Sequence, residues 1–375
     1  MVPDSLYDAW ISSTNWSASG VVEHIVKYSD TQPLTFTAKQ DNSSVRIART
    51  SSSAPALSLE YSTDGGSTWS DYTISNTISL NYDDSVKFRA KTTNTAMGSS
   101  EYNYNHFVLS GEIEASGNIN FLLSRNGVLS GNLPNYCFYK TFYGCSALTT
   151  VPSLPYNGPI PQGGYREMFR GCSSIHAGPS ILPSSNVGER GYEGMFQECT
   201  NLQTAPSLPA TTLGSECYGD MFYGCTSLTT APSLPATTLA NSCYMSMFDS
   251  CTGLTKAPRL PATTLSNGCY SNMFSGCTSL NTITIDYVGN FSNTYFDNWV
   301  NGVANSGTFI YNGSDTTRGV SAIPSGWTIQ PLTLVDYINV NRADFDTGVA
   351  ANDNIRVVGG FRGNSVGNRF LGTSD

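Results

Sequence analysis

Apolar residues recur along the middle of the chain with one long, nearly constant period. A unit built on Phe-x-x-Cys-x-x-Leu, or on a close variant of it, occurs six times. Its cysteines are Cys145, Cys172, Cys199, Cys225, Cys251 and Cys277, so successive copies lie 27, 27, 26, 26 and 26 residues apart. A unit this short cannot bury its own apolar face and has to stack on its neighbours. The pattern therefore predicts a solenoid over residues 119–330.

Within one unit, the apolar spacing predicts a short helix followed by a very short strand. The helix is indicated by the spacing of Cys217, Met221, Phe222 and Cys225, which would share one helical face. The strand would lie within 228–235 and stay short, because Pro232 has no N–H to donate to a sheet. After the last copy, residues 281–286 alternate without proline and residues 292–303 predict a longer helix. These two segments would form the C-terminal cap that a solenoid needs.

Ahead of the repeats the pattern changes to the two-residue period of β-strands. Six short runs between residues 34 and 110, separated by turn residues such as Asp64-Gly65-Gly66, predict a small Ig-like β-sandwich over 32–118. We interpret residues 1–31 as an attachment segment. Residues 331–375 are similar to the opening strands of a jelly-roll or lectin-like module, and a C-terminal tail is the alternative. The expected fold class is mainly β with short helices.

Two parts of the chain resemble a known family. Units of the type Met-Phe-x-Gly-Cys-Thr-Ser-Leu, and the later run from Gly307 to Trp327, look like BspA-type leucine-rich repeats of gut bacteria and their phages. The segment from Leu59 to Trp69 is similar to the β-domain often placed ahead of such repeats. The resemblance covers residues 32–330 and implies a right-handed leucine-rich-repeat solenoid with a role in adhesion or recognition. The proline in nearly every strand departs from the usual repeat.

Composition and charge narrow the range of partners. Charged residues make up 13% of the chain, the net charge is −9, and no run of Lys or Arg occurs. This argues against binding to nucleic acid or to an anionic membrane surface, since both need a basic patch. The first residues are acidic where a signal peptide is basic, and no apolar run is long enough to span a membrane. We therefore expect no membrane insertion, and export on a particle released by lysis rather than by general secretion.

The ten cysteines allow three interpretations. Four units hold a pair eight residues apart, as in Cys217 and Cys225, but Gly164 and Gly191 replace the first member in two other units. We therefore favour a buried ladder of reduced thiols over disulfides between units or a metal site, since a free cysteine packs like a small apolar residue. The chain contains no Cys-x-x-Cys pair for zinc, so no metal or other cofactor is expected.

The sequence contains no pattern that argues for catalysis. Ser62 to Trp69 fits the Asp-box of sialidase propellers, but a single copy indicates a hairpin rather than a propeller. Glu112 and Glu114 would lie on one side of a strand, where a solvated pair is a simpler interpretation than a glycosidase dyad. The three histidines, His24, His106 and His176, share no motif. The chain is therefore predicted not to be an enzyme.

Binding is expected on the surface of the solenoid. The outward positions of its short strands would be Thr150, Thr204, Thr230, Lys256 and Thr282, followed by Pro152, Pro206, Pro232 and Pro258. They predict a flat, neutral, repetitive face suited to lattice-like contacts or to glycans. A second candidate surface follows the repeated Phe at Tyr143, Arg170, Gln197, Tyr223 and Asp249. The residue at this position differs from unit to unit. Exposed positions without a function also vary freely, and we favour that explanation over a recognition surface.

The function favoured by these features is that of a non-enzymatic fibre or decoration protein on the virion surface of a gut bacteriophage. Its N-terminus would attach to other virion proteins, and its solenoid would contact bacterial surface or mucosal glycans or proteins. A homotrimer is expected because fibres are symmetric oligomers. The alternatives are a BspA-type adhesin on a bacterial cell surface and the accessory part of a carbohydrate-active enzyme.

Overall fold

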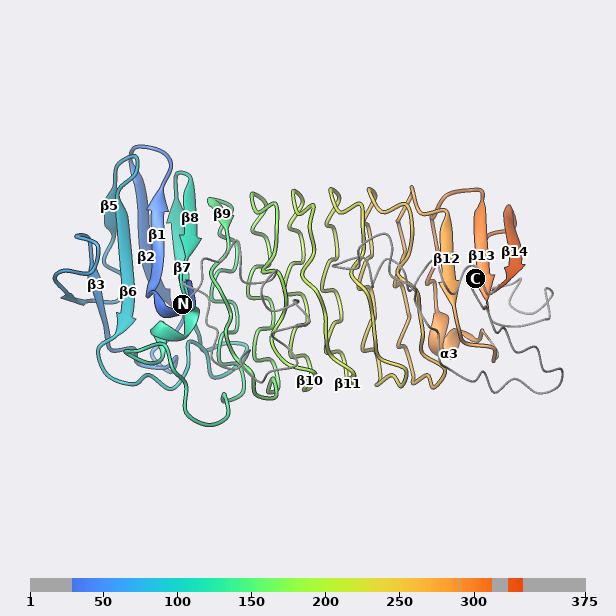
Figure 1. The fold of residues 1–375 in the computed structure, drawn as a ribbon, viewed down its shortest axis with the longest axis horizontal. Coiled ribbons are helices and arrows are strands. Elements are labelled where there is room, and N and C mark those ends of the chain that lie inside the picture. The colour runs from blue at the N-terminus through green and yellow to red at the C-terminus, as the bar shows by residue number, and fades with distance from the viewer. Residues whose placement is uncertain (1–28, 290, 312–322, 333–375) are drawn as a thin grey trace, which may run out of the picture.

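The computed structural model describes residues 29–289, 291–311 and 323–332, which form a mainly β structure with almost no helix. Figure 1 shows a group of long strands at one end, joined to a row of stacked coils that follows the long axis. Most of the expected attachment segment (1–31) and of the expected C-terminal segment (331–375) lies outside the described residues.

The N-terminal strands form two sheets because their side chains alternate between the core and the surface. In β1 the inward residues Leu34, Phe36 and Ala38 are fully buried and the two between them are partly exposed. The sheet orders are β4-β3-β6-β1-β8-β9 and β5-β2-β7. The strands are β1 (Leu34–Ala38), β2 (Ser43–Arg49), β3 (Leu59–Ser62), β4 (Ser70–Tyr72), β5 (Ile78–Leu80), β6 (Ser85–Ala90), β7 (Asn105–Ser110) and β8 (Ile113–Ser116).

Six of these strands coincide with the six predicted runs, β8 lies where Glu112 and Glu114 were expected on a strand, and β4 was not predicted from the sequence. The Asp-box segment is the hairpin turn between β3 and β4. Asp64 accepts hydrogen bonds from the hydroxyl and the backbone N–H of Thr68 and from the Ser62 hydroxyl. These donors stabilise the ionised carboxylate and hold the pKa of Asp64 well below its usual range.

The first coil continues the sandwich without a break. β9 (Leu148–Thr150) pairs in parallel with β8, so the first strand of the coils belongs to a sandwich sheet. The Phe107 ring of β7 stacks on Phe142, just ahead of the first repeated cysteine, with ring centres 5.2 Å apart. Buried apolar residues from Leu34 to Trp327 form one contiguous core cluster. The sandwich therefore covers the apolar edge that the first coil would otherwise expose.

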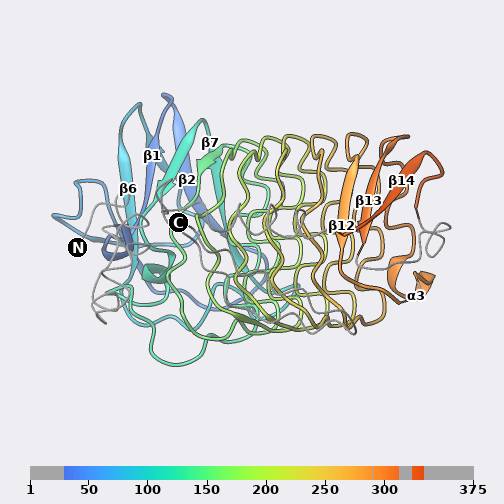
Figure 2. The same cartoon turned by 45° about the vertical axis from the view of Figure 1, so that its right-hand side comes forward.

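We number the coils by their repeated cysteines: coil 1 is 145–171, coil 2 is 172–198, coil 3 is 199–224, coil 4 is 225–250 and coil 5 is 251–276. Figure 2 shows that these coils lie parallel and in register along the axis. The regular strands they contain are short: β10 (Asn186–Val187) pairs in parallel with β11 (Thr212–Leu213). Elsewhere single parallel bridges join coils, such as Ala177 to Thr204 and Thr238 to Thr264.

The segment that precedes each repeated cysteine is a series of turns and not the predicted helix. Two kinds of hydrogen bond alternate along it: Met221 N–H donates three residues back to Tyr218, and Phe222 N–H donates to Met247 in the next coil. Every fourth residue is left-handed, with φ of 56° at Glu216, 52° at Asp220 and 71° at Gly224. The expected helix is therefore wrong. A four-residue turn repeat brings residues i and i+4 to one side almost as an α-helix does.

Two columns of aromatic rings fill the core of the coils. In the first column, rings are stacked from Phe107 through Phe274 with centres 5.2–5.9 Å apart. Its members are Phe107, Phe142, Phe169, Phe196, Phe222, Phe248 and Phe274. The second column runs from Phe138 through five tyrosines to Phe296. Because each coil places an aromatic ring at the same position, each ring packs on the ring of the neighbouring coil.

The far end of the stack is closed by aromatic residues and a small parallel sheet. β12 (Thr282–Ile285), β13 (Gly307–Tyr311) and β14 (Trp327–Pro331) lie side by side at this end (Figure 1). The expected strand at 281–286 corresponds to β12. The expected helix over 292–303 is reduced to one turn, α3 (Asn293–Phe296), and Trp299 behind it packs on Phe274. The end of the stack is therefore covered by large aromatic side chains such as Trp299, and not by a long helix.

Candidate binding surfaces

The repeated cysteines lie inside the coils, where each thiol makes the same contact. The thiol of Cys172 donates to the carbonyl of Phe142, 3.1 Å away in the turn segment that ends at Cys145. Cys199 makes the same contact with Phe169, in the turn segment that ends at Cys172. The series runs through Cys145, Cys172, Cys199, Cys225, Cys251 and Cys277. All ten cysteines are free and buried. Burial raises the pKa of the Cys225 thiol to about 12, which leaves it unreactive near neutral pH.

The cysteines missing from two units are replaced by neighbouring side chains. A Cβ added to Gly191 would lie 2.6 Å from Val187, and one added to Gly164 would lie 3.1 Å from Ile160. In coils 3 to 5 the residue equivalent to Val187 is a leucine, such as Leu213, which is not branched at Cβ. The Gly-for-Cys exchange is therefore a matter of packing volume.

The row of side chains expected on the strand segments is exposed in most coils. Thr150, Thr204, Thr230 and Lys256 are exposed and Thr282 is half-buried. The bridge from Lys256 to Thr282 places two of them on adjacent coils. Coil 2 breaks the row, because Ala177 pairs with Thr204 at this position. We call the outward side of these segments the strand face.

The prolines expected beside this row do not lie on the surface. Pro152, Pro206 and Pro258 are buried and Pro232 is half-buried, so this part of the expectation is wrong. The exposed positions are instead the serines that follow, Ser207 and Ser233. A second exposed set was not singled out from the sequence, namely the threonine pairs 211–212, 237–238 and 263–264.

The second expected surface follows the repeated Phe and lies on the turn segments, whose outward side we call the turn face. Tyr143 is 38% exposed, and the equivalent residues Arg170, Gln197, Tyr223 and Asp249 are half-buried. Tyr143 lies between two cations, with Lys140 Nζ 4.6 Å and the Arg170 guanidinium 5.9 Å from its ring centre. The structure therefore spaces these five residues in one row, one per coil.

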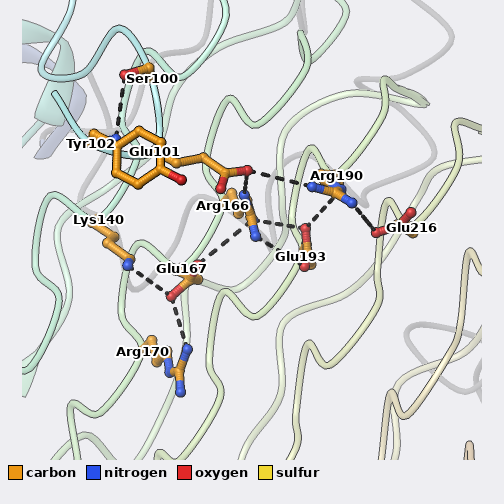
Figure 3. Close-up of polar contacts among 10 residues, drawn as sticks. All are labelled: Ser100, Glu101, Tyr102, Lys140, Arg166, Glu167, Arg170, Arg190, Glu193 and Glu216. Carbon is orange, nitrogen blue, oxygen red and sulfur yellow. Dashed lines mark hydrogen bonds and ion pairs between the residues drawn. The ribbon is translucent and has the colours of Figure 1, made fainter. Parts of the chain in front are cut away.

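Beside this row, the turn face of the first three coils carries a network of ion pairs that the sequence analysis missed (Figure 3). Glu101, from a loop of the sandwich, pairs with Arg166 and with Arg190. Arg166 Nε lies 2.8 Å from a Glu193 oxygen, and Arg190 pairs with Glu216 at 2.9 Å. A second branch joins Glu167 to Lys140 at 3.4 Å and to Arg170 at 3.1 Å. We call these residues the charged patch.

Two carboxyl groups on the turn face, Glu193 in the charged patch and Asp220 near it, are harder to ionise than usual. Burial raises the pKa of Glu193 to about 7, which outweighs the attraction of Arg166 and Arg190. Burial, reinforced by nearby Asp249, raises the pKa of Asp220 to about 6. Arg166 Nε and Glu193 Oε2 are close but lack hydrogen-bond geometry, whereas Arg166 Nη2 donates a hydrogen bond to Glu193 Oε1, 3.3 Å away. Arg166 and Glu193 each lie six residues before a repeated cysteine, and these opposite charges at equivalent positions are the sequence signal for this patch.

A groove of about 1360 Å³ lies where the strand face meets the sandwich. It contains Glu112 and Glu114, and Lys39 Nζ lies 3.2 Å from the Glu114 carboxylate. His176 also lines it, whereas His106 is partly buried in β7 and burial lowers its pKa. His24 is outside the described residues.

Two further properties concern only the described part of the chain. Within it, no three His, Cys, Asp or Glu side chains are arranged so that they could hold a metal ion. The helices found there are all too short or too polar to cross a membrane.

Comparison with known proteins gives one weak likeness. No protein-family model matches the chain, and no curated protein matches it. A solved structure of a leucine rich cell surface protein from Faecalibacterium prausnitzii A2-165 is 12% identical, over 77% of this chain and 98% of that chain, with a TM-score of 0.19. At this TM-score the two folds do not superpose as a whole, so the function below rests on the residues of this chain.

Proposed function

We propose that this chain is a non-enzymatic surface protein that adheres to, or recognises, a partner through a leucine-rich-repeat solenoid of the BspA type. The carrier would be a phage particle or, alternatively, a bacterial cell surface. The observation that supports this proposal most is the strand face, an exposed row with one outward position per coil on a stack held rigid by its core. Stacks of this kind offer extended surfaces rather than single pockets.

The chemistry of the strand face also supports a binding role. Its outward side chains in coils 3 and 4 are hydroxyls, as at Thr204, Ser207 and Thr230, which can both donate and accept hydrogen bonds. The core of these coils is closed by stacked rings and unreactive thiols. A long ligand would therefore meet the surface of the stack and not its interior.

The experiment that tests this proposal is binding of the labelled protein to a panel of intact gut bacteria, to mucin and to host matrix proteins. Saturable binding to particular bacteria would favour the phage carrier, and binding only to mucin or matrix would favour the bacterial adhesin. No saturable binding to any of them would contradict the proposal.

Matched variants locate the binding surface in the same assay. Replacing Thr204 and Thr230 by Lys alters the strand face of coils 3 and 4, and replacing Gln197 and Tyr223 by Lys alters the turn face. We expect the first pair to lower binding at least about tenfold and the second to leave it within about twofold. Equal losses for both pairs would contradict a role for the strand face.

A further inference from the structure

The groove lies at coils 1 and 2, where the length and the sequence of the repeat differ from those of the later coils. Residues 204–213 of coil 3 and 230–239 of coil 4 share one sequence, and coil 5 differs from it only at Lys256 and Arg259. Coils 1 and 2 are one residue longer. The groove lining departs from that sequence at Val151 and 156–158 in coil 1 and along 176–183 in coil 2. Because coils 3 to 5 stack well with the repeated sequence, stacking alone does not require this divergence. Added residues in a repeat protein gather at the binding face.

The walls of the groove combine apolar and hydrogen-bonding groups. Val128 is 68% exposed and Ile181 is 53% exposed, although both are aliphatic. Tyr156 also lines the groove and is 6% exposed. Exposed amides at Asn132 and Asn157 stand near them. A ligand that fits here has both C–H surfaces and groups that exchange hydrogen bonds.

One buried amide in the groove lining has an unused acceptor. Asn120 is 2% exposed, and its Nδ2 donates to the carbonyl of Pro155, 3.0 Å away. Its Oδ1 has no hydrogen-bond partner among the described residues. A buried carbonyl oxygen without a donor is costly in a folded protein, so a donor from outside the chain would stabilise this site.

The ionisable groups of the groove decide which ligand charge it accepts. Three carboxylates line it, at Asp30, Glu112 and Glu114, and the nearby ammonium of Lys39 is already paired with Glu114. The described residues that line the groove include no lysine or arginine. An anionic ligand would therefore be repelled, and an uncharged or amino-bearing one would not.

We propose that this groove binds a short segment of a glycan that carries no anionic groups. Pyranose rings offer apolar C–H faces for Ile181 and Val128, and hydroxyl or amide donors for Asn120 and Asn157. This inference rests on the function proposed above, because it names the ligand class and the place of first contact for the same strand face.

The test is a titration of the full chain with three tetrasaccharide probes. These are N-acetylated chitotetraose, its fully deacetylated amine form, and a sulfated heparin tetrasaccharide. We expect the first two to bind saturably and the third to bind at least about tenfold more weakly. Equal or tighter binding of the heparin probe would overturn the inference. Competition of chitotetraose against bacteria and against mucin then separates a bacterial from a mucosal source of the glycan.

Matched variants assign the binding to the groove. Ile181→Asp removes an exposed aliphatic group from the groove, and Thr238→Asp adds the same charge to an exposed position in coil 4. We expect at least about tenfold weaker binding of chitotetraose for the first and a change within about twofold for the second. Glu112→Lys should weaken the amine probe and strengthen the heparin probe. Equal effects of the two Asp variants would overturn the assignment.

Failure of this inference and failure of the proposed function give different results. If chitotetraose and its amine form do not bind while the protein still binds cells or mucin, the inference is wrong and the proposed function stands. If the protein binds neither the probes nor any cell or mucin sample, both are wrong.

Discussion

At the residue scale, each repeated cysteine uses its thiol as a weak hydrogen-bond donor to a backbone carbonyl in the buried core. The Phe169 carbonyl accepts hydrogen bonds from the N–H of Cys172, three residues later in the chain, and from the thiol of Cys199, the next repeated cysteine. The thiol therefore uses the second lone pair of a carbonyl that would otherwise be half-satisfied in a dry core. Its size and polarizability let it pack as an apolar group at the same time.

Removing one thiol should lower stability without altering the fold. Cys225→Ala removes the 3.1 Å contact with the Phe196 carbonyl and leaves a small cavity. We expect the free energy of unfolding to fall by about 2 kcal/mol, as measured by urea denaturation followed by circular dichroism. Thr229→Ala, at an exposed position of the same coil, is the control and should change it by less than about 0.5 kcal/mol. An unchanged midpoint for Cys225→Ala would show that the thiol contributes nothing.

The charged patch should make stability depend on pH. The pKa of Glu193 is about 7 in the folded chain against a usual value of 4.5, so the folded state binds this proton more tightly than the unfolded state does. Stability should therefore fall as pH rises from about 4.5 to about 7. Melting temperatures at pH 5, 6, 7 and 8 measure this.

The variant Glu193→Gln should flatten that dependence, because it removes the titrating group and keeps the shape of the side chain. Glu198→Gln, at an exposed position one turn away, is its control and should leave the slope as it is. A slope that is the same in the Glu193→Gln variant would place the titration elsewhere in the patch.

Single residues were predictable from the sequence where one coil defines their environment. The free thiols follow from the Gly exchanges at 164 and 191, and the exposed threonines follow from their place after the cysteine. The buried prolines and the ion pairs of Arg166 did not follow, because both depend on how a coil is placed against its neighbours. The partner of Arg166 in the sandwich, Glu101, is 65 residues away in the sequence.

At the scale of elements, the regular shape of the turn segments depends on a left-handed backbone conformation at every fourth residue. Eleven of the residues in these segments with positive φ are not glycine, among them Lys140, Glu167 and Ser246. Each such residue costs about 1–2 kcal/mol in isolation, and the hydrogen bonds to the next coil compensate for it. The helix prediction failed because hydrophobic spacing alone does not separate a 3.6-residue period from a four-residue one.

Backbone conformation rather than space should decide which residues these turns accept. At Gly224 φ is 71°, and an added Cβ would meet only ordinary contacts, with Glu198 atoms 3.8 Å away. Gly224→Val should lower the free energy of unfolding by about 1–2 kcal/mol because a β-branched residue resists this φ. Gly224→Asn should cost clearly less, since Asn tolerates the left-handed region. Urea denaturation of both variants measures the difference, and equal losses would point to crowding instead.

At the scale of the whole molecule, coils contact mainly their nearest neighbours. Deleting residues 226–251 removes one full repeat and joins Cys225 to Thr252, which stands where Thr226 stood. We expect a folded, shorter stack with nearly unchanged circular dichroism per residue. Small-angle scattering should show a reduced maximum dimension. Loss of all folded structure would contradict the nearest-neighbour arrangement.

The sandwich should be indispensable for a different reason. It contributes β8 to the pairing of the first coil and Phe107 to the first ring column. Without residues 1–118, the Phe142 ring and the β9 edge would face water, which promotes edge-to-edge association. Size-exclusion chromatography of residues 119–375 should therefore show aggregates. A monomeric, cooperatively folding fragment would mean that the first coil covers its own edge.

The overall arrangement was more predictable than its junctions. A constant repeat length indicates stacked units whatever the detail of each unit, because every unit must bury the same face. The continuous sheet across β8 and β9, and the groove beside it, depend on how two different architectures meet. In the sequence, the one sign of this junction is the extra residue in each of the units 145–171 and 172–198.

The hydrogen bonds between coils point along the long axis, and this has a mechanical consequence. A force that pulls the two ends of the stack apart loads the contacts of the terminal coil first and leaves the inner coils almost unloaded. The chain should therefore yield by peeling, one coil after another, at nearly the same modest force each time. Each step would release 26 or 27 residues, or roughly 90 Å of extended chain. Such a molecule gives way gradually under tension and keeps its remaining coils intact, which suits a tether between two moving surfaces.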